Sequence, residues 1–328
     1  MRGDLYPLRF VPIYKEKVWG GRRLERVFGR ALPAGARVGE SWEIADHGAD
    51  VSVVADGPWA GRGLDEIVSG DARRVLGSAL AAARRGRFPL LVKALDASKN
   101  LSIQVHPPDG YASVHEGGGP GKTELWYVAD ADEGAGVLCG LRDGVGREAV
   151  LRALEEERLP ECLRLIPVKK GDAIFVPAGR IHAVCAGVLV IEIEENSDIT
   201  YRLYDWGRKG RPMHRGKGLD VTDFADRSDP LLAKRWEEGD GFRTARLARC
   251  PYFSTAVHEV GARMRSCCAG DRFRILSVAS GSGVIRHGGA GGETALRGGD
   301  HFLLPAGLGG YTIDADRGGC VLLQTEVP

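Results

Sequence analysis

The sequence predicts a mainly β protein made of two related β-barrels, with a few helices packed around the N-terminal half. Residues 171–182 and 299–310 share one pattern: a Gly, five residues, a Pro, one residue, a Gly, two residues and then a twelfth position. The 47 glycines lie mostly between short apolar segments, as expected for strands joined by tight turns. A chain of 328 residues is long enough for two such domains.

The repeat keeps a potential metal ligand in only one of its two copies. The twelfth position is His182 in the first copy and Gly310 in the second. The apolar segment 273–278 adds no paired His or Glu to the second copy. We therefore expect a chemically active domain over residues 1–207 and a degenerate, metal-free domain over residues 208–328. The basic, Gly-rich stretch 208–218 is the expected junction.

The clearest strand signals lie in the first domain. Residues 88–94 form a short apolar run typical of a buried strand. Residues 125–128 and 137–141 flank an acidic turn that contains Gly, which favours a hairpin. In residues 188–194 apolar side chains alternate with Glu192 and Glu194, so this strand should have two different faces.

Three segments have helical character. Residues 64–85 carry Ala, Leu and Arg at helical spacing, with Gly70 and Gly77 expected to divide them. Residues 147–165 have one apolar side and should be interrupted near Pro160. Residues 220–236 are a weaker candidate, broken by Pro230.

Charge and cysteine content exclude several classes of partner. The 45 basic residues nearly balance the 44 acidic ones, which gives no electrostatic reason to expect nucleic acid or a membrane surface. No apolar stretch is long enough to span a bilayer, and the first residues lack the apolar run of a signal peptide. The seven cysteines are scattered without a CxxC pair, which favours reduced thiols. We expect a cytoplasmic protein.

The strongest chemical signal is a set of potential metal ligands. In an extended strand, residues i and i+2 share a face, so Gln104 and His106 should project together, as should Lys122 and Glu124. His182 follows at the end of the Gly-Pro-Gly turn. Two imidazoles, a carboxylate and an amide oxygen make a mixed nitrogen and oxygen site suited to Zn²⁺ or another first-row divalent ion. The remaining histidines are interpreted as structural.

The turn that ends in His182, with a His and a Glu upstream on strand-like segments, resembles the two-motif pattern of the cupin superfamily. In that superfamily the ligands line the mouth of a small, jelly-roll-like β-barrel. This resemblance leaves the reaction open, because one barrel hosts many chemistries.

Flanking residues narrow the resemblance. Seven segments, in order, resemble the short bacterial form of the type I mannose-6-phosphate isomerases, from about residue 9 to about residue 206 and more loosely to the C-terminus. They are residues 17–21, 39–43, 93–97, 101–107, 121–127, 176–183 and 196–205. The helical insertion of the longer enzymes is absent.

The resemblance assigns roles position by position. The family's metal ligands fall on Gln104, His106, Glu124 and His182, which implies one Zn²⁺ per chain, or another divalent ion. Its active-site residues fall on Arg202, Lys122 and Asp198, and its substrate-binding positions on Ser102 and Lys93. Arg180 stands where a small residue is common, so we expect it to alter the pocket mouth.

The activity implied is the interconversion of mannose 6-phosphate and fructose 6-phosphate, with a small sugar phosphate as the only partner. It requires a proton to move between C1 and C2, and a charged enediolate must be stabilised. Glu124, Asp198, Lys122 and a metal-bound water remain open as the proton shuttle, and the protein could be a monomer or a homodimer.

Two other function classes share parts of this pattern. An iron-dependent cupin oxidoreductase would share the metal site, but it usually has a second histidine where Gln104 stands. A non-catalytic sugar-binding cupin would not need Lys122, Asp198 and Arg202 beside all four ligands. Both alternatives are therefore less favoured.

Overall fold

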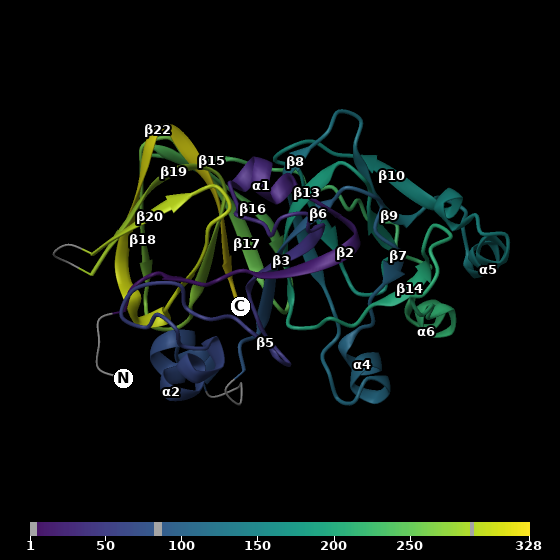
Figure 1. Ribbon diagram of the computed structural model, residues 1–328, viewed down its shortest axis with the longest axis horizontal. Helices are drawn as coiled ribbons and strands as arrows, with labels where there is room; N and C mark the ends of the chain where they lie inside the picture. The colour runs from purple at the N-terminus through teal and green to yellow at the C-terminus, as the bar shows by residue number, and fades with distance from the viewer. Residues whose placement is uncertain (1–4, 82–86, 289–291) are drawn as a thin grey trace.

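The fold is mainly β, as predicted, and two β-barrels lie side by side (Figure 1). The computed structural model describes residues 5–81, 87–288 and 292–328. The N-terminal barrel is drawn mainly in purple to green and the C-terminal barrel in green to yellow.

Two sheets facing each other form the N-terminal barrel. The first has the order β11-β8-β13-β6-β3-β2 and the second the order β10-β9-β12-β7-β14. The first consists of β2 (Ile13–Gly21), β3 (Val38–Ile44), β6 (Leu90–Ala97), β8 (Glu124–Ala131), β11 (Ala173–Val176) and β13 (Val188–Glu195). The second consists of β7 (Ile103–Val105), β9 (Gly136–Leu141), β10 (Leu163–Pro167), β12 (His182–Val184) and β14 (Tyr201–Tyr204).

Strand β13 shows how the sequence sets the two faces of the first sheet. Leu189, Ile191 and Ile193 join a core that also contains side chains of the C-terminal barrel. Val188 and Val190 point the other way, into the core of the N-terminal barrel. The predicted two-faced strand is confirmed. However, its Glu192 and Glu194 face is buried inside the barrel and not in solvent.

One nine-stranded, strongly curved sheet forms the C-terminal barrel, with β1 and β15 at the two ends of its strand order. Its edge strand β1 (Leu8–Arg9) comes from the start of the chain and pairs antiparallel with β21 (His301–Leu304). The other strands are β15 (Glu237–Gly239), β16 (Phe242–Arg249), β17 (Ser254–Val260), β18 (Arg263–Cys268), β19 (Arg274–His287), β20 (Gly292–Arg297) and β22 (Gly309–Glu326). A separate short pair, β4 (Asp46–His47) and β5 (Asp50–Val51), lies in the N-terminal half.

Short helices pack around the barrels. They are α1 (Arg23–Phe28), α2 (Leu64–Leu76), α3 (Ser78–Ala81), α4 (Asp109–His115), α5 (Arg147–Glu155) and α6 (Arg215–Val221), with 3₁₀ turns η1 (Leu159–Cys162) and η2 (Ala306–Leu308). Among the described residues no helix is both long and apolar enough to cross a membrane.

Two of the three helix predictions are confirmed in part. The segment 64–85 forms α2 and α3, separated at Gly77, whose φ of 100° favours glycine. Gly70 does not end the helix, but its neighbour Asp71 has a non-helical backbone that kinks it. Residues 82–85 lie outside the described part of the chain. The segment 147–165 forms α5 and η1, with Pro160 in the 3₁₀ turn.

Two local predictions are wrong. The segment 220–236 contains only the end of α6, because Pro230 and several Asp side chains fix it as an extended loop. Strands β8 and β9 are not a hairpin. β8 pairs with β11 and β13, whereas β9 pairs with β10 and β12 in the opposite sheet. The turn between them crosses from one sheet to the other, and turn composition alone does not distinguish the two cases.

Candidate active site

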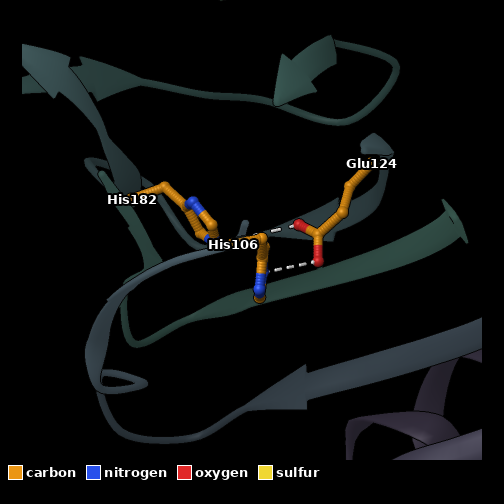
Figure 2. A group of neighbouring side chains, drawn as sticks. All are labelled: His106, Glu124 and His182. Atoms are coloured by element: carbon orange, nitrogen blue, oxygen red, sulfur yellow. Dashed lines mark ion pairs between the residues drawn. The ribbon is translucent and has the colours of Figure 1, made fainter. Parts of the chain in front are cut away.

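Three of the four predicted metal ligands, His106, Glu124 and His182, converge inside the N-terminal barrel (Figure 2). Gln104 lies on β7 and His106 follows that strand, while His182 begins β12 directly opposite Gln104. Glu124 begins β8 in the other sheet and is fully buried. The two sheets therefore bring ligands that are far apart in the chain to one point.

The two imidazoles are oriented by the backbone. His106 Nδ1 donates a hydrogen bond to the Ile199 carbonyl at 2.7 Å, and His182 Nδ1 donates to the Arg180 carbonyl at 2.8 Å. The Nε2 atom of each ring therefore carries a free lone pair, and both Nε2 atoms face Glu124. His106 Nε2 lies 3.0 Å from Glu124 Oε1, and His182 Nε2 lies 3.8 Å from Glu124 Oε2. Fixing one ring nitrogen in this way is the usual arrangement for metal-binding histidines.

The spacing and chemistry of these atoms fit a divalent metal ion. A tetrahedral site with bonds of about 2.0–2.1 Å places neighbouring ligand atoms about 3.3 Å apart. The distances from the Glu124 oxygens to His106 Nε2 and to His182 Nε2, 3.0 Å and 3.8 Å, lie on either side of this ideal ligand-to-ligand distance. His106 Nε2 and Glu124 Oε2 are buried without a hydrogen-bond partner among the described residues, whereas Glu124 Oε1 is ion-paired with Lys122. Buried polar atoms are rarely left unpaired, so this group is suited to hold an ion.

Protonation also favours metal binding. Burial lowers the pKa of His182 to about 3, so its imidazole is neutral at physiological pH. Burial opposes ionisation of Glu124, but Lys122 and His106 outweigh it and lower the pKa of this carboxyl well below its usual value. A neutral imidazole and an ionised carboxylate are the forms that bind metals.

Gln104 lies beside His106, Glu124 and His182, and its side-chain amide is close to both His182 and Ser102. Its Nε2 is 3.4 Å from His182 Nε2, and its Oε1 accepts a hydrogen bond from the Ser102 hydroxyl at 3.4 Å. Because the two ends of an amide can exchange by rotation, Gln104 can present its oxygen to the same point.

A cavity of about 360 Å³ opens beside the ligands. It is lined by six of the predicted site residues, together with residues that were not predicted to belong to the site. The predicted residues are Lys93, Ser102, Gln104, Lys122, Asp198 and Arg202, and the others include Lys17, Trp19, Glu40, Glu192, Arg211 and His214.

Buried ion pairs connect the ligands with the cavity wall. Lys122 Nζ lies 2.6 Å from Glu124 and 2.8 Å from Glu194. Glu194 also pairs with Lys93, at 2.6 Å. Glu192 accepts a hydrogen bond from the Trp126 indole at 2.9 Å. Glu194 therefore bridges two buried lysines, and the sequence signal for it was the alternation along β13.

The basic segment after β14 forms another part of the wall. Arg202 Nη1 donates to the Pro212 carbonyl at 2.8 Å, and the Arg202 backbone N–H donates to His214 Nδ1 at 3.2 Å. The Arg202 Nε atom is buried and has no partner among the described residues. Arg211 is paired with Asp205. The expected junction 208–218 thus contributes side chains to the cavity.

The expectation for Arg180 is wrong. Its side chain is buried and does not line the cavity. The guanidinium donates to Asp226 at 2.6 Å, to the Phe175 carbonyl at 2.7 Å and to Ser228. Arg180 points away from the ligand His182, two residues further on, and anchors the loop before β15.

Comparisons with known proteins agree with this geometry. Residues 8–129 match a family model described as phosphomannose isomerase type I, catalytic domain, and residues 243–322 match one described as mannose-6-phosphate isomerase, cupin domain. Two relatives from Bacillus subtilis (strain 168) are similar over 94% of this chain and 96% of their own length. They are the probable mannose-6-phosphate isomerase GmuF, 36% identical, and mannose-6-phosphate isomerase ManA, 37% identical.

A solved structure supports the same relationship. The mannose 6-phosphate isomerase from Bacillus subtilis superimposes with a TM-score of 0.87 at 33% identity, covering 97% of this chain and 99% of that one. The similarity thus extends over both barrels and over the segments that carry the site. The chain belongs to the type I mannose-6-phosphate isomerase family.

Proposed function

We propose that this protein is an aldose-ketose isomerase that interconverts mannose 6-phosphate and fructose 6-phosphate. The observation that carries the proposal is the group of His106, Glu124 and His182, which lies beside a cavity lined by Gln104, Lys122 and Arg202. Membership of the family supports the same substrate.

We propose that Gln104, His106, Glu124 and His182 hold one divalent ion per chain, with Zn²⁺ as the preferred metal. The unpartnered atoms of His106 and Glu124 support this assignment. The bound ion would supply Lewis-acid stabilisation of negative charge on the sugar oxygens.

The two lysines of the cavity act as fixed positive charges. Burial opposes their ionisation, but Glu124 outweighs it for Lys122 and Glu194 outweighs it for Lys93, so both pKa values are raised. Protonated lysines cannot accept a proton, so they serve to stabilise the enediolate or the phosphate.

Two carboxyl groups of the cavity have pKa values that are shifted in opposite directions. Burial opposes ionisation of Asp198, but Lys93 and Lys122 outweigh it and lower its pKa. Burial, reinforced by Glu194, raises the pKa of Glu192 well above its usual value. Such a divergence is typical of a base and an acid in one active site. We assign Asp198 the proton transfer between C1 and C2, and Glu192 proton donation to a sugar oxygen.

The phosphate is assigned to the basic side of the cavity. Arg202 and Arg211 carry planar guanidinium groups suited to phosphate oxygens, and Lys17 adds a further charge. Ser102 is assigned to position Gln104 and to contact the sugar. Because phosphorylated sugars are metabolites of the cell interior, and all seven cysteines are free, we place the enzyme in the cytoplasm.

The domain division that we propose is a catalytic unit over residues 1–207 and a metal-free unit over residues 208–328. The C-terminal barrel has Gly310 at the position of His182. Among the residues that the structure describes, the potential metal-binding groups all lie in the N-terminal barrel.

A coupled assay with metal-analysed protein tests the proposal. We expect turnover of mannose 6-phosphate that is lost on chelation and regained on addition of Zn²⁺. The control is His106→Ala, which should lose both metal and turnover, while unphosphorylated mannose should react poorly. Fully metal-loaded protein that does not convert mannose 6-phosphate would contradict the assignment.

A further inference from the structure

A second cavity, of about 460 Å³, lies where the two barrels meet and shares no lining residue with the first. Its walls come from the start of β6, the first residue of α4, the end of β13 and the turn between β16 and β17. The lining residues are Arg87, Phe88, Pro89, Asp109, Pro120, Glu195, Asn196 and Tyr252.

Glu195 is the unusual group in this cavity. It ends β13, where its neighbour Glu194 pairs with the catalytic lysines. The Glu195 side chain is only 4% exposed, and its Oε1 has no hydrogen-bond partner among the described residues. Burial, reinforced by Asp109, raises the pKa of Glu195 to about 8. Hydrogen bonds with Thr123 act in the opposite direction and do not outweigh burial. A buried carboxyl oxygen without a partner is costly, and a bound donor group would remove this cost.

Asp109 provides a second, well-oriented carboxylate. Its Oδ1 accepts a hydrogen bond from the Gly121 backbone at 2.7 Å. Its Oδ2 accepts one from the Tyr252 hydroxyl of the C-terminal barrel at 2.8 Å. Asp109 is thus held in place and adds negative charge, while Glu195 keeps unused acceptor capacity.

The chemistry of the cavity excludes a bare metal ion as its natural ligand. Ca²⁺ takes six to eight oxygen ligands and Mg²⁺ a near-octahedral set, whereas this cavity offers two carboxyl groups, one of them already hydrogen-bonded. Its volume is that of a site for a molecule of several heavy atoms. Pro120 and the Tyr252 ring provide apolar surface for a carbon skeleton.

We propose that this cavity binds a small organic ammonium compound. Its ammonium group would donate to Glu195 beside Asp109, and its carbon skeleton would lie against Pro120 and Tyr252. An ammonium group satisfies the unpaired carboxyl oxygen and neutralises the two acids together. The site is separate from the sugar-phosphate cavity, and the proposal does not depend on the isomerase activity.

Binding of benzylammonium chloride to the full-length, metal-loaded protein, followed by calorimetry at constant ionic strength, tests the proposal. We expect saturable binding of one molecule per chain, and at least tenfold weaker binding of the neutral analogue benzyl alcohol. Binding should persist in His106→Ala, because the metal site is elsewhere. Equal binding of the alcohol, or loss of binding in His106→Ala, would overturn the proposal.

Glu195→Gln is the matched variant, since it keeps the shape and removes the charge. It should weaken benzylammonium binding at least tenfold while turnover of mannose 6-phosphate stays unchanged. If this variant is misfolded by its melting curve, Pro120→Trp, at an exposed position, should block the cavity instead. Unchanged binding in a folded Glu195→Gln or Pro120→Trp protein would sink the idea.

The pH dependence provides an independent readout. The groups that face Glu195 are Asp109 of α4 and Cys250 and Tyr252 of the C-terminal barrel, with Arg87 at the rim. Burial raises the pKa of both Cys250 and Tyr252 above their usual values, so neither ionises below pH 8. Binding should therefore tighten as the pH rises from 6.5 to 8 and release a proton. Affinity that is constant over this interval would count against Glu195 as the binding group.

Discussion

At the scale of single residues, the site depends on charges that are buried and paired. Lys93, Lys122 and Glu194 form one chain of ion pairs that ends at Glu124, a proposed metal ligand. Each of these side chains is almost fully buried. Removing one partner of a buried pair leaves the other charge uncompensated, which costs more than the pair itself contributes.

Glu194→Gln tests this dependence. The change keeps the shape but leaves Lys93 and Lys122 without their shared carboxylate, so we expect unfolding to become easier by about 3–5 kcal/mol. Urea denaturation of metal-loaded protein measures the loss. In the control Glu161→Gln, which removes an exposed partner of Arg158, the loss should stay below about 1 kcal/mol. If the free energy of unfolding fell by a similarly small amount in both variants, the ion pairs of Glu194 with Lys93 and Lys122 would contribute little to stability.

Arg202→Lys tests the assignment of the guanidinium. The variant keeps the charge and loses the planar fork, so kcat/KM should fall by roughly tenfold to a thousandfold. Metal content and melting temperature should stay at wild-type values. Arg158→Lys, at an exposed ion pair, is the control and should turn over normally. Wild-type turnover in Arg202→Lys would show that this residue does not act on the substrate.

His301 allows a stability prediction that no metal complicates. It is buried in the C-terminal barrel, where its Nδ1 lies 2.8 Å from the Ser277 hydroxyl, and burial lowers its pKa to about 3. Between pH 6.5 and about 3 the unfolded chain therefore binds a proton that the folded protein does not, and stability falls as the pH falls.

In His301→Gln the free energy of unfolding should fall less steeply as the pH falls. The difference in slope from the wild-type protein should be about 1.4 kcal/mol per pH unit at most. Urea denaturation at several pH values between 4 and 7 measures the slope. Turnover at pH 7 should stay near wild type, because the C-terminal barrel holds no proposed catalytic residue. An unchanged slope would mean that His301 does not limit acid stability.

At the scale of elements, one hydrogen-bonded connection runs from the C-terminal barrel to the segment just before β8. Asp109 begins α4, accepts the Tyr252 hydroxyl of the C-terminal barrel and also holds Gly121, the residue before Lys122. The C-terminal barrel thereby helps to position Lys122 without contributing a side chain to the catalytic cavity.

Tyr252→Phe should therefore reduce kcat a few-fold and leave metal content unchanged, because one hydrogen bond of about 1 kcal/mol is lost and Lys122 becomes less well placed. A coupled assay and metal analysis measure both quantities. The matched control is Tyr111→Phe on α4, whose hydroxyl reaches only the exposed Asp220 at 3.4 Å. An equal loss in both variants would argue against the connection through Asp109.

The sequence predicted strands and turns that can be recognised from a few consecutive residues. It did not predict which strands pair with each other when the partners are far apart in the chain. The alternation of residues 188–194 predicted β13, and turn residues predicted the turn that precedes His182 and β12. The pairing of β8 and β9 was wrong, because the partner of a strand is decided by the whole barrel.

The same limit applies to the site. The proposed ligands lie in short motifs, and the sequence predicted the three that the structure brings together, His106, Glu124 and His182. Glu194 was visible as part of an alternating strand, but its side of the sheet depends on barrel closure. Arg211 and His214 reach the cavity only because their loop folds back along β14. Arg180 was misplaced, since its partner Asp226 lies 46 residues further along the chain.

At the scale of the whole molecule, the two barrels form one cooperative body. Apolar side chains from β13 and from the C-terminal strands share a single core. Strand β1, from the N-terminus, completes an edge of the C-terminal sheet.

A chain cut after residue 207 should therefore aggregate or bind ANS, because the outer face of β13 would be exposed and β1 would lack its partner. Size-exclusion chromatography and dye binding would detect this. The full-length variant Gly310→Ala is the control, since no atom lies within 4 Å of an added Cβ there, and it should fold and turn over normally. A monomeric, active fragment of residues 1–207 would contradict the shared core.

The pairing of Leu8 with Leu303 has a consequence for protein synthesis. Leu8 is synthesised long before its partner Leu303. At about 5–20 residues per second, β1 waits roughly 15–60 s before β21 exists. During that time the Arg9 carbonyl can already accept a hydrogen bond from the Ala55 backbone, but the side of β1 that faces β21 stays unpaired. A nascent chain released before residue 304 cannot complete this edge, so the pairing distinguishes chains that contain β21 from chains that end before it.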